Sequence, residues 1–217
     1  HEYEVQATIE YVFRDSGACC WGFPSIVASG RNATTLHYET NNDAIAPGAL
    51  MLTDIGAEVE GYAADVTRTY PQSGRFTPGQ RAVYEAVLRA QDGSMALMKP
   101  GARMADVHEA AIRLLGEGLL KLGLVSRNER EQVRMYFPHG LGHQLGLRVH
   151  DVTDRNRALE AGMIVTNEPG IYVRPADVRA NPAYQGLPAG ERAGIDAALQ
   201  PYAHIGVRIE DDALITA

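Results

Sequence analysis

The sequence lacks several features that mark particular classes of protein. Its 217 residues contain only two cysteines, and no apolar run reaches the roughly 20 residues that span a bilayer. No basic segment followed by a short apolar run and a small-residue cleavage site stands near its start. Cys19 and Cys20 are neighbours, and because a disulfide between adjacent residues is strained, both are expected to be free thiols in a reducing compartment. The sequence therefore predicts a cytoplasmic location.

Positive charge is also scarce. The formal net charge is −7 at pH 7, from 20 Lys and Arg against 27 Asp and Glu. Nucleic acids and anionic membranes are bound by clusters of Lys and Arg, so neither is an expected partner. What is present is an ordinary globular composition, 45% hydrophobic and 22% charged. That composition and length predict one well-packed domain over residues 1–217.

Three segments carry signals for long helices. Apolar residues at helical spacing predict a helix over Glu4–Ser16. Because this pattern begins within a turn of His1, which is not an initiator methionine, an upstream segment is expected. Thr77–Gln80 combines an N-cap residue, a proline at the first helical position and a glutamine that can close a capping box, so a helix should run from there to about Lys99. A broad apolar face predicts another helix over Val107–Leu122.

Strand signals occupy the first half of the chain between these helices. Ile26–Ala28 is a short apolar run after a Gly-Phe-Pro break, which predicts a strand. Ala49–Gly56 and Tyr62–Tyr70 are separated by a short turn, and together they predict a β-hairpin.

The second half has a different composition. A short helix near Asn128–Tyr136 is expected to precede two β-rich apolar runs, Met163–Val173 and Ile205–Ile215. The Pro, Gly and Ala-rich stretch between them, Arg174–Tyr202, is expected to be an insertion loop. Each half thus ends in a pair of strands that bear carboxylates, which hints at internal duplication.

Two acidic residues stand where a half-buried strand would normally carry small or apolar side chains. Asp54 lies within Met51–Ile55, and a hairpin could place Asp65 across from it. Opposed carboxylates repel by roughly 0.2–1 kcal/mol, and a cation between them would convert that repulsion into coordination. The alternative is that one aspartate is exposed and the other caps a turn.

His143, Glu168 and Glu210 occupy similarly apolar settings, where burial is costly unless the group is paired or binds a metal. Four carboxylates and one imidazole form a hard donor set, suited to Mn²⁺, Co²⁺ or Zn²⁺. Two ions balance four negative ligands better than one. Ions about 3.5–4 Å apart can share a water, lower its pKa and polarise a carbonyl.

Several segments resemble the signatures of one family, the pita-bread metallopeptidases, in their aminopeptidase P and prolidase branch. These segments are Phe137–Asp151, Asn167–Tyr172 and Gly206–Asp212. The run Leu36-His37-Tyr38, followed by Asp54 and Asp65, is similar to the family's earlier motifs in the same order. The resemblance covers nearly the whole chain, with five ligand positions in register.

The resemblance implies an α+β pita-bread fold, with two pseudo-symmetric αββ-type halves around a dinuclear metal centre, most simply two Mn²⁺ ions. By position, Asp54 resembles a bidentate ligand of one ion, while Asp65 and Glu210 resemble bridging carboxylates. His143 and Glu168 would complete the shell of the other ion. The counterpart of Glu168 also assists proton transfer from the bridging water, so that role is assigned here as a hypothesis.

Further residues match family positions around the substrate. His150 is suited to hydrogen-bond the scissile carbonyl, and His37 to contact the proline side or the departing group. His139 resembles another non-ligand histidine of the family, although a lone histidine is often a structural residue. Arg208 matches an arginine beside the metal site, the alternative being a surface salt bridge of little energetic value.

The resemblance leaves several functions open. The expected activity is hydrolysis of the Xaa-Pro bond at peptide N-termini, with a proline-containing peptide as partner and homo-oligomer formation undecided. Prolidase, which cleaves only the dipeptide, is the alternative, and a non-catalytic binding module or a hydrolase of another amide is a further one. The pattern around His143 differs from that of methionine aminopeptidase. Because relatives carry an upstream domain, an intact metal site with weakened activity is expected.

Overall fold

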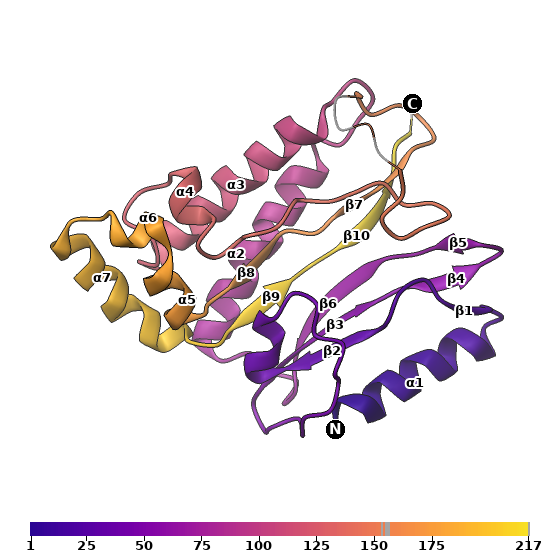
Figure 1. Ribbon diagram of the computed structural model, residues 1–217, viewed down its shortest axis with the longest axis horizontal. Helices are drawn as coiled ribbons and strands as arrows, with labels where there is room; N and C mark the ends of the chain where they lie inside the picture. Colours follow the sequence, from indigo (N-terminus) through magenta and orange to yellow (C-terminus); the bar gives the residue numbers. More distant parts are fainter. Residues whose placement is uncertain (153, 155–156, 217) are drawn as a thin grey trace.

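The protein, described by a computed structural model over residues 1–152, 154 and 157–216, is built from helices on both sides of a set of antiparallel strands (Figure 1). The helices are α1 (Glu2–Asp15), α2 (Pro78–Met95), α3 (Met104–Lys121), α4 (Arg130–Val133), α5 (Pro175–Ala180), α6 (Pro182–Gln185) and α7 (Ala189–Leu199), with 3₁₀ turns η1 (Gly30–Thr34) and η2 (Gln200–Tyr202). The strands are β1 (Cys20–Trp21), β2 (Ile26–Ser29), β3 (Leu50–Ile55), β4 (Ala57–Val59), β5 (Tyr62–Ala63), β6 (Val66–Pro71), β7 (Ile164–Asn167), β8 (Gly170–Tyr172), β9 (Gly206–Arg208) and β10 (Asp211–Leu214). Figure 1 shows α1 on one side of the strands, α2 and α3 on the other, and α5 to α7 gathered at one end.

The helices predicted from periodicity and capping are confirmed. At the start of α2 the amide of Gln80 donates to Thr77 Oγ1 at 3.3 Å, and the amide of Thr77 donates to Gln80 Oε1 at 2.9 Å, which is the expected capping box. The helix ends at Met95, before the expected Lys99. After α3 the chain turns at Gly123, whose φ of 73° favours glycine.

The predicted hairpin exists, but its register differs from the expected one. β3 pairs with β2 on one side and β6 on the other, and Asp54 lies opposite Thr67. Asp65 is therefore not directly across from Asp54. The ladder stops at the pair Ile55 and Val66 because the intervening residues form the separate β4–β5 hairpin. Asp65 consequently reaches Asp54 diagonally, from just before β6.

Each apolar run of the second half forms two strands. β7 pairs with β10, and β8 pairs with β9. Between β7 and β8 the chain passes from one strand pair to the other at Glu168–Pro169. Between β9 and β10 it does so at Ile209–Glu210. Proline has no amide hydrogen to donate to a ladder. Two acidic side chains therefore stand at junctions between strands.

The prediction of an insertion loop over Arg174–Tyr202 is wrong, because the segment contains α5, α6 and α7. Pro175 and Pro182 occupy first helical positions, where proline is favoured rather than disruptive. Apolar side chains of this segment are buried in the main core: Val178, Tyr184, Ile195 and Leu199 from the helices, and Leu187 from the connection between α6 and α7. Pro175 and Pro182 thus mark helix starts, and Gly190 and Gly194 lie within α7 rather than in a loop.

The main core lies between α2, α3 and the strands of the second half. It includes Val83 and Val87 of α2, Leu115 and Leu119 of α3, and Ile171 of β8. A Cβ at Gly118 would lie 2.6 Å from the Cβ of Ala86, so the two long helices approach closely there. Among the described residues, no helix combines the length and apolarity needed to cross a bilayer.

Candidate metal centre

The residues predicted to form the site line the same cavity, whose volume is about 1040 Å³. They are Asp54, Asp65, His143, Glu168 and Glu210, together with His37, His139, His150 and Arg208. The structure thus brings together every side chain that the sequence motifs proposed. Their individual roles as ligands or catalytic groups stay predictions.

Strand junctions of the two halves meet at the acidic residues. Asp54 lies near the end of β3 and Asp65 just before β6. The amide of Glu210 donates to the carbonyl of Thr67 at 3.1 Å, and Thr67 Oγ1 donates to Glu210 Oε2 at 2.6 Å. The amide of Asp65 in turn donates to Asp212 Oδ2 at 3.1 Å. These bonds hold β6 against the β9–β10 junction.

The segment that carries His143 runs beside β7. The amide of Thr166 donates to the carbonyl of His143 at 2.9 Å, and the amide of Glu168 donates to the carbonyl of Leu141 at 2.8 Å. A Cβ at Gly142 would lie 2.0 Å from the Thr166 carbonyl oxygen. Glycine is therefore required for this approach, which sets His143 beside Glu168.

The imidazole of His143 faces the carboxylates. Its Nε2 lies 3.4 Å from Asp65 Oδ2 and 3.7 Å from Glu168 Oε1. Its Nδ1 lies 3.1 Å from the carbonyl oxygen of Gln144, an arrangement in which Nδ1–H donates to the backbone and Nε2 keeps its lone pair for a metal. Donor atoms of Asp65, His143 and Glu210 all lie within 4.8 Å of one another.

Three of the four acidic side chains are buried, and their charges are only partly compensated. The exposed fraction is 9% for Asp54, 5% for Asp65 and 1% for Glu210. Burial, and then the charge of Asp54, raise the pKa of Asp65 to about 9. Burial also raises the pKa of Glu168, and the negative charge of Glu210 adds to that shift. Burial raises the pKa of Glu210 as well, and there the charge of Asp65 contributes.

Three carboxylate oxygens of this group are buried without a hydrogen-bond donor: Asp54 Oδ1, Asp65 Oδ1 and Glu210 Oε1. A buried charged oxygen without a partner is costly. Divalent cations would compensate all three oxygens together, and oxygen and imidazole donors suit hard or borderline ions. The residues present therefore fit a metal centre.

A buried chain of hydrogen bonds borders the carboxylates. Arg208 is only 3% exposed and forms an ion pair with Asp54, so the alternative of a surface salt bridge is wrong. Its Nη1 donates to the hydroxyl of Tyr172 at 2.9 Å, and that hydroxyl lies 2.9 Å from His139 Nε2. Tyr172 and Thr67, which accepts a bond from Arg208 Nε at 3.1 Å, were missed. Tyr172 stood within a quoted motif, but nothing distinguished it from a core aromatic.

His139 is held by the protein on both ring nitrogens. Its Nδ1 lies 2.8 Å from the carbonyl of Gly140, and Nε2 contacts Tyr172. Burial, followed by the charge of Arg208, lowers the pKa of His139 to about 3. The ring is therefore neutral at physiological pH, with Nδ1–H donating to Gly140 and Nε2 accepting from Tyr172.

The other two histidines lie nearer the solvent. His150 is exposed, and its ring meets that of His143 edge to face with centroids 4.4 Å apart.

The segment with His37 is fastened to the first turn of α1, because the hydroxyl of Tyr38 donates to Glu2 Oε2 at 2.8 Å. Glu2 is fully buried, and sequence reasoning missed it because an acid in a first helical turn usually interacts with the helix dipole.

Comparison with known proteins points in the same direction. The family description "Metallopeptidase family M24" matches residues 1–217. The chain is 39% identical to a Xaa-Pro aminopeptidase of Escherichia coli, covering 99% of this chain and 46% of that protein. It is 38% identical to Xaa-Pro aminopeptidase 3 of Homo sapiens, covering 98% and 39% respectively. The chain thus spans less than half the length of these relatives.

Solved structures share the fold. Proline aminopeptidase P II from Yersinia pestis superposes with a TM-score of 0.84 at 40% identity, covering all of this chain and 48% of that one. A variant of Escherichia coli aminopeptidase P in complex with substrate gives a TM-score of 0.83 at 37% identity, covering 99% and 47%. The α+β pita-bread architecture expected from the motifs is confirmed.

Proposed function

The chain belongs to metallopeptidase family M24, and from this premise we propose that it hydrolyses the bond between an N-terminal residue and a following proline. One observation carries the proposal. Unpaired carboxylate oxygens of three buried acids converge beside His143 in a large cavity, in a chain similar over nearly its whole length to Xaa-Pro aminopeptidases. We further propose a cytoplasmic location, which the two free thiols support.

Five side chains would hold two divalent ions, for which we propose Mn²⁺. Asp65 and Glu210 would be shared between the ions, with Asp54 on one ion and His143 and Glu168 on the other. The short separation of His143 Nε2 from Asp65 Oδ2 and Glu168 Oε1 supports this division. When bound, the ions supply a Lewis acid for the scissile carbonyl and lower the pKa of the attacking water.

The chain's own residues would then handle protons and orientation. Glu168 Oε1 lies 3.7 Å from Nε2 of His143, where the carboxylate could accept a proton from water and pass it to the departing amine. Arg208 holds Asp54 through its ion pair and acts as a positioning residue. His150 and His37 line the cavity, where they would contact the scissile carbonyl and the proline.

The test compares a Xaa-Pro-Yaa tripeptide with a Xaa-Pro dipeptide, using protein stripped of metal and then supplied with Mn²⁺. Metal-dependent cleavage of the tripeptide is expected, and Asp65→Ala should abolish it. Asp92→Ala, on an exposed position of α2, is the matched control and should keep full activity. Cleavage of the dipeptide alone would favour prolidase, and two bound ions without any cleavage would contradict a peptidase.

A further inference from the structure

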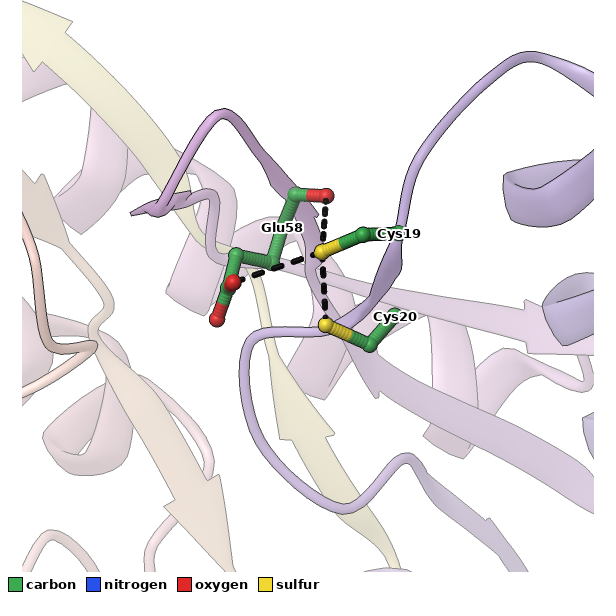
Figure 2. Close-up of side chains that lie close together, drawn as sticks. All are labelled: Cys19, Cys20 and Glu58. Atoms are coloured by element: carbon green, nitrogen blue, oxygen red, sulfur yellow. Dashed lines mark hydrogen bonds between the residues drawn. The ribbon is translucent and has the colours of Figure 1, made fainter.

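A second cluster of metal-ligand side chains lies outside the cavity, on the small sheet formed by β1, β4 and β5. It consists of Cys19, Cys20 and Glu58 (Figure 2). Cys20 pairs with Glu58 across β1 and β4, and the amide of Cys19 donates to the carbonyl of Glu58 at 3.1 Å. The backbone of two strands therefore fixes the three side chains relative to one another.

The three side chains turn toward a common point. Cys19 Sγ lies 2.8 Å from Cys20 Sγ and 3.3 Å from Glu58 Oε1, and Figure 2 shows both thiols beside the glutamate. Successive side chains of an extended strand point to opposite faces, but Cys19 precedes β1, so the neighbouring thiols can share a side. The sequence predicts only that Cys19 and Cys20 are free thiols.

We propose that Cys19, Cys20 and Glu58 form a second metal site, which binds one Zn²⁺ or another thiolate-preferring divalent ion. Two cysteines and a carboxylate are ligands that zinc accepts, with Zn–S bonds of about 2.3 Å. Tetrahedral coordination places two such sulfurs roughly 3.8 Å apart, so binding would open the pair by about 1 Å. The site goes beyond the proposed peptidase function and does not depend on it.

The surroundings allow an ion to enter from solvent. Cys19 is exposed, and Cys20 and Glu58 are partly exposed, so water can occupy the remaining coordination position. Binding of an ion would displace protons from the thiols, because the thiolate is the metal ligand. The donor set also separates the two sites chemically, because the cavity offers oxygen and imidazole and this cluster offers sulfur.

The test uses the reduced, Mn²⁺-loaded protein titrated with Cd²⁺, a spectroscopic substitute for zinc. Cys19 and Cys20 are the chain's two cysteines, so a sulfur-to-cadmium charge-transfer band reports this cluster and not the cavity. One equivalent of Cd²⁺ should produce the band, and Zn²⁺ should compete for the site. Cys19→Ser and Cys20→Ser should each abolish the band while leaving peptidase activity unchanged.

The role of the carboxylate is tested separately. Glu58→Gln should weaken Cd²⁺ affinity about tenfold or more, whereas Glu60→Gln, an exposed neighbour in the same hairpin, should not. Absence of the band at equimolar Cd²⁺, or oxidation of the pair to a disulfide in place of binding, would overturn the site. Equal affinities of Glu58→Gln and the unaltered protein would overturn the three-donor arrangement.

Discussion

Removal of the metal ions should make the stability of the protein fall as the pH rises. The pKa of Asp65 is raised from its usual value of 3.8 to about 9, chiefly by burial and then by Asp54, and the pKa values of Glu168 and Glu210 are raised as well. The folded metal-free protein therefore keeps protons that the unfolded chain loses above about pH 4. This contribution to stability is complete below pH 4 and is lost as the pH rises toward 9.

The loss of unfolding free energy in the metal-free protein is best measured between about pH 6.5 and 8.5. Below that window the lowered pKa values of His139 and His150 oppose the trend, because the unfolded chain binds protons on histidine up to about pH 6.5. Within it, one retained proton changes the free energy of unfolding by about 1.4 kcal/mol per pH unit. Over two units the loss is about 2.7 kcal/mol, or a fall in Tm of roughly 5–10 °C.

Thermal unfolding of chelator-treated protein, followed by circular dichroism across this window, measures the effect. Asp65→Asn is the matched control, since it keeps the shape of the side chain and removes its titration, and its Tm should vary less with pH. Saturating Mn²⁺ should flatten or reverse the slope of the unaltered protein, because ion binding requires deprotonated ligands. A metal-free Tm at pH 8.5 equal to or above that at pH 6.5 would refute the reasoning.

Substitutions at three further positions test other features of the molecule. Glu168→Gln should lower kcat by roughly 10²–10⁴-fold, as expected for a general base, and full activity in a steady-state peptide assay would contradict the proton-transfer role. Glu2→Ala should lower the free energy of unfolding in urea by about 3 kcal/mol, because it leaves buried donors without their acceptor, and Glu2→Gln should cost less. Gly142→Ala should reduce the affinity for Mn²⁺ in calorimetry, since its Cβ would displace Thr166. Unchanged affinity would show that the backbone at Thr166 can shift without disturbing the metal centre.

Sequence reasoning recovered the long helices and the site because both depend on local or strongly patterned signals. The capping box at Thr77 and the apolar face of Val107–Leu122 are each readable within a few turns of chain. The residues proposed as ligands stand out because acids in apolar strands are costly unless paired, and because the motifs around them resemble those of one family. All of these residues line one cavity in the structure.

The features that were missed depend on tertiary contacts. The register that sets Asp54 opposite Thr67 follows from a hairpin within a hairpin, which hydrophobic alternation does not reveal. The helices over 175–199 were hidden because prolines stand at the starts of α5 and α6 and two glycines lie within α7, and both residue types usually indicate a loop. Tyr172 became visible only once its hydroxyl was seen between Arg208 and His139.

The long separation in sequence between the partners at the metal centre has a consequence for the order of folding. Arg208 and Asp54 are 154 positions apart, and Glu210 and Thr67 are 143 apart. Closing such loops is entropically expensive, and contacts of this kind slow folding. We therefore expect the ligands to meet only after α2, α3 and the two sets of strands have formed, so that ions bind a nearly complete protein. Cys19 and Glu58, 39 positions apart, could meet much earlier in the assembly of the chain.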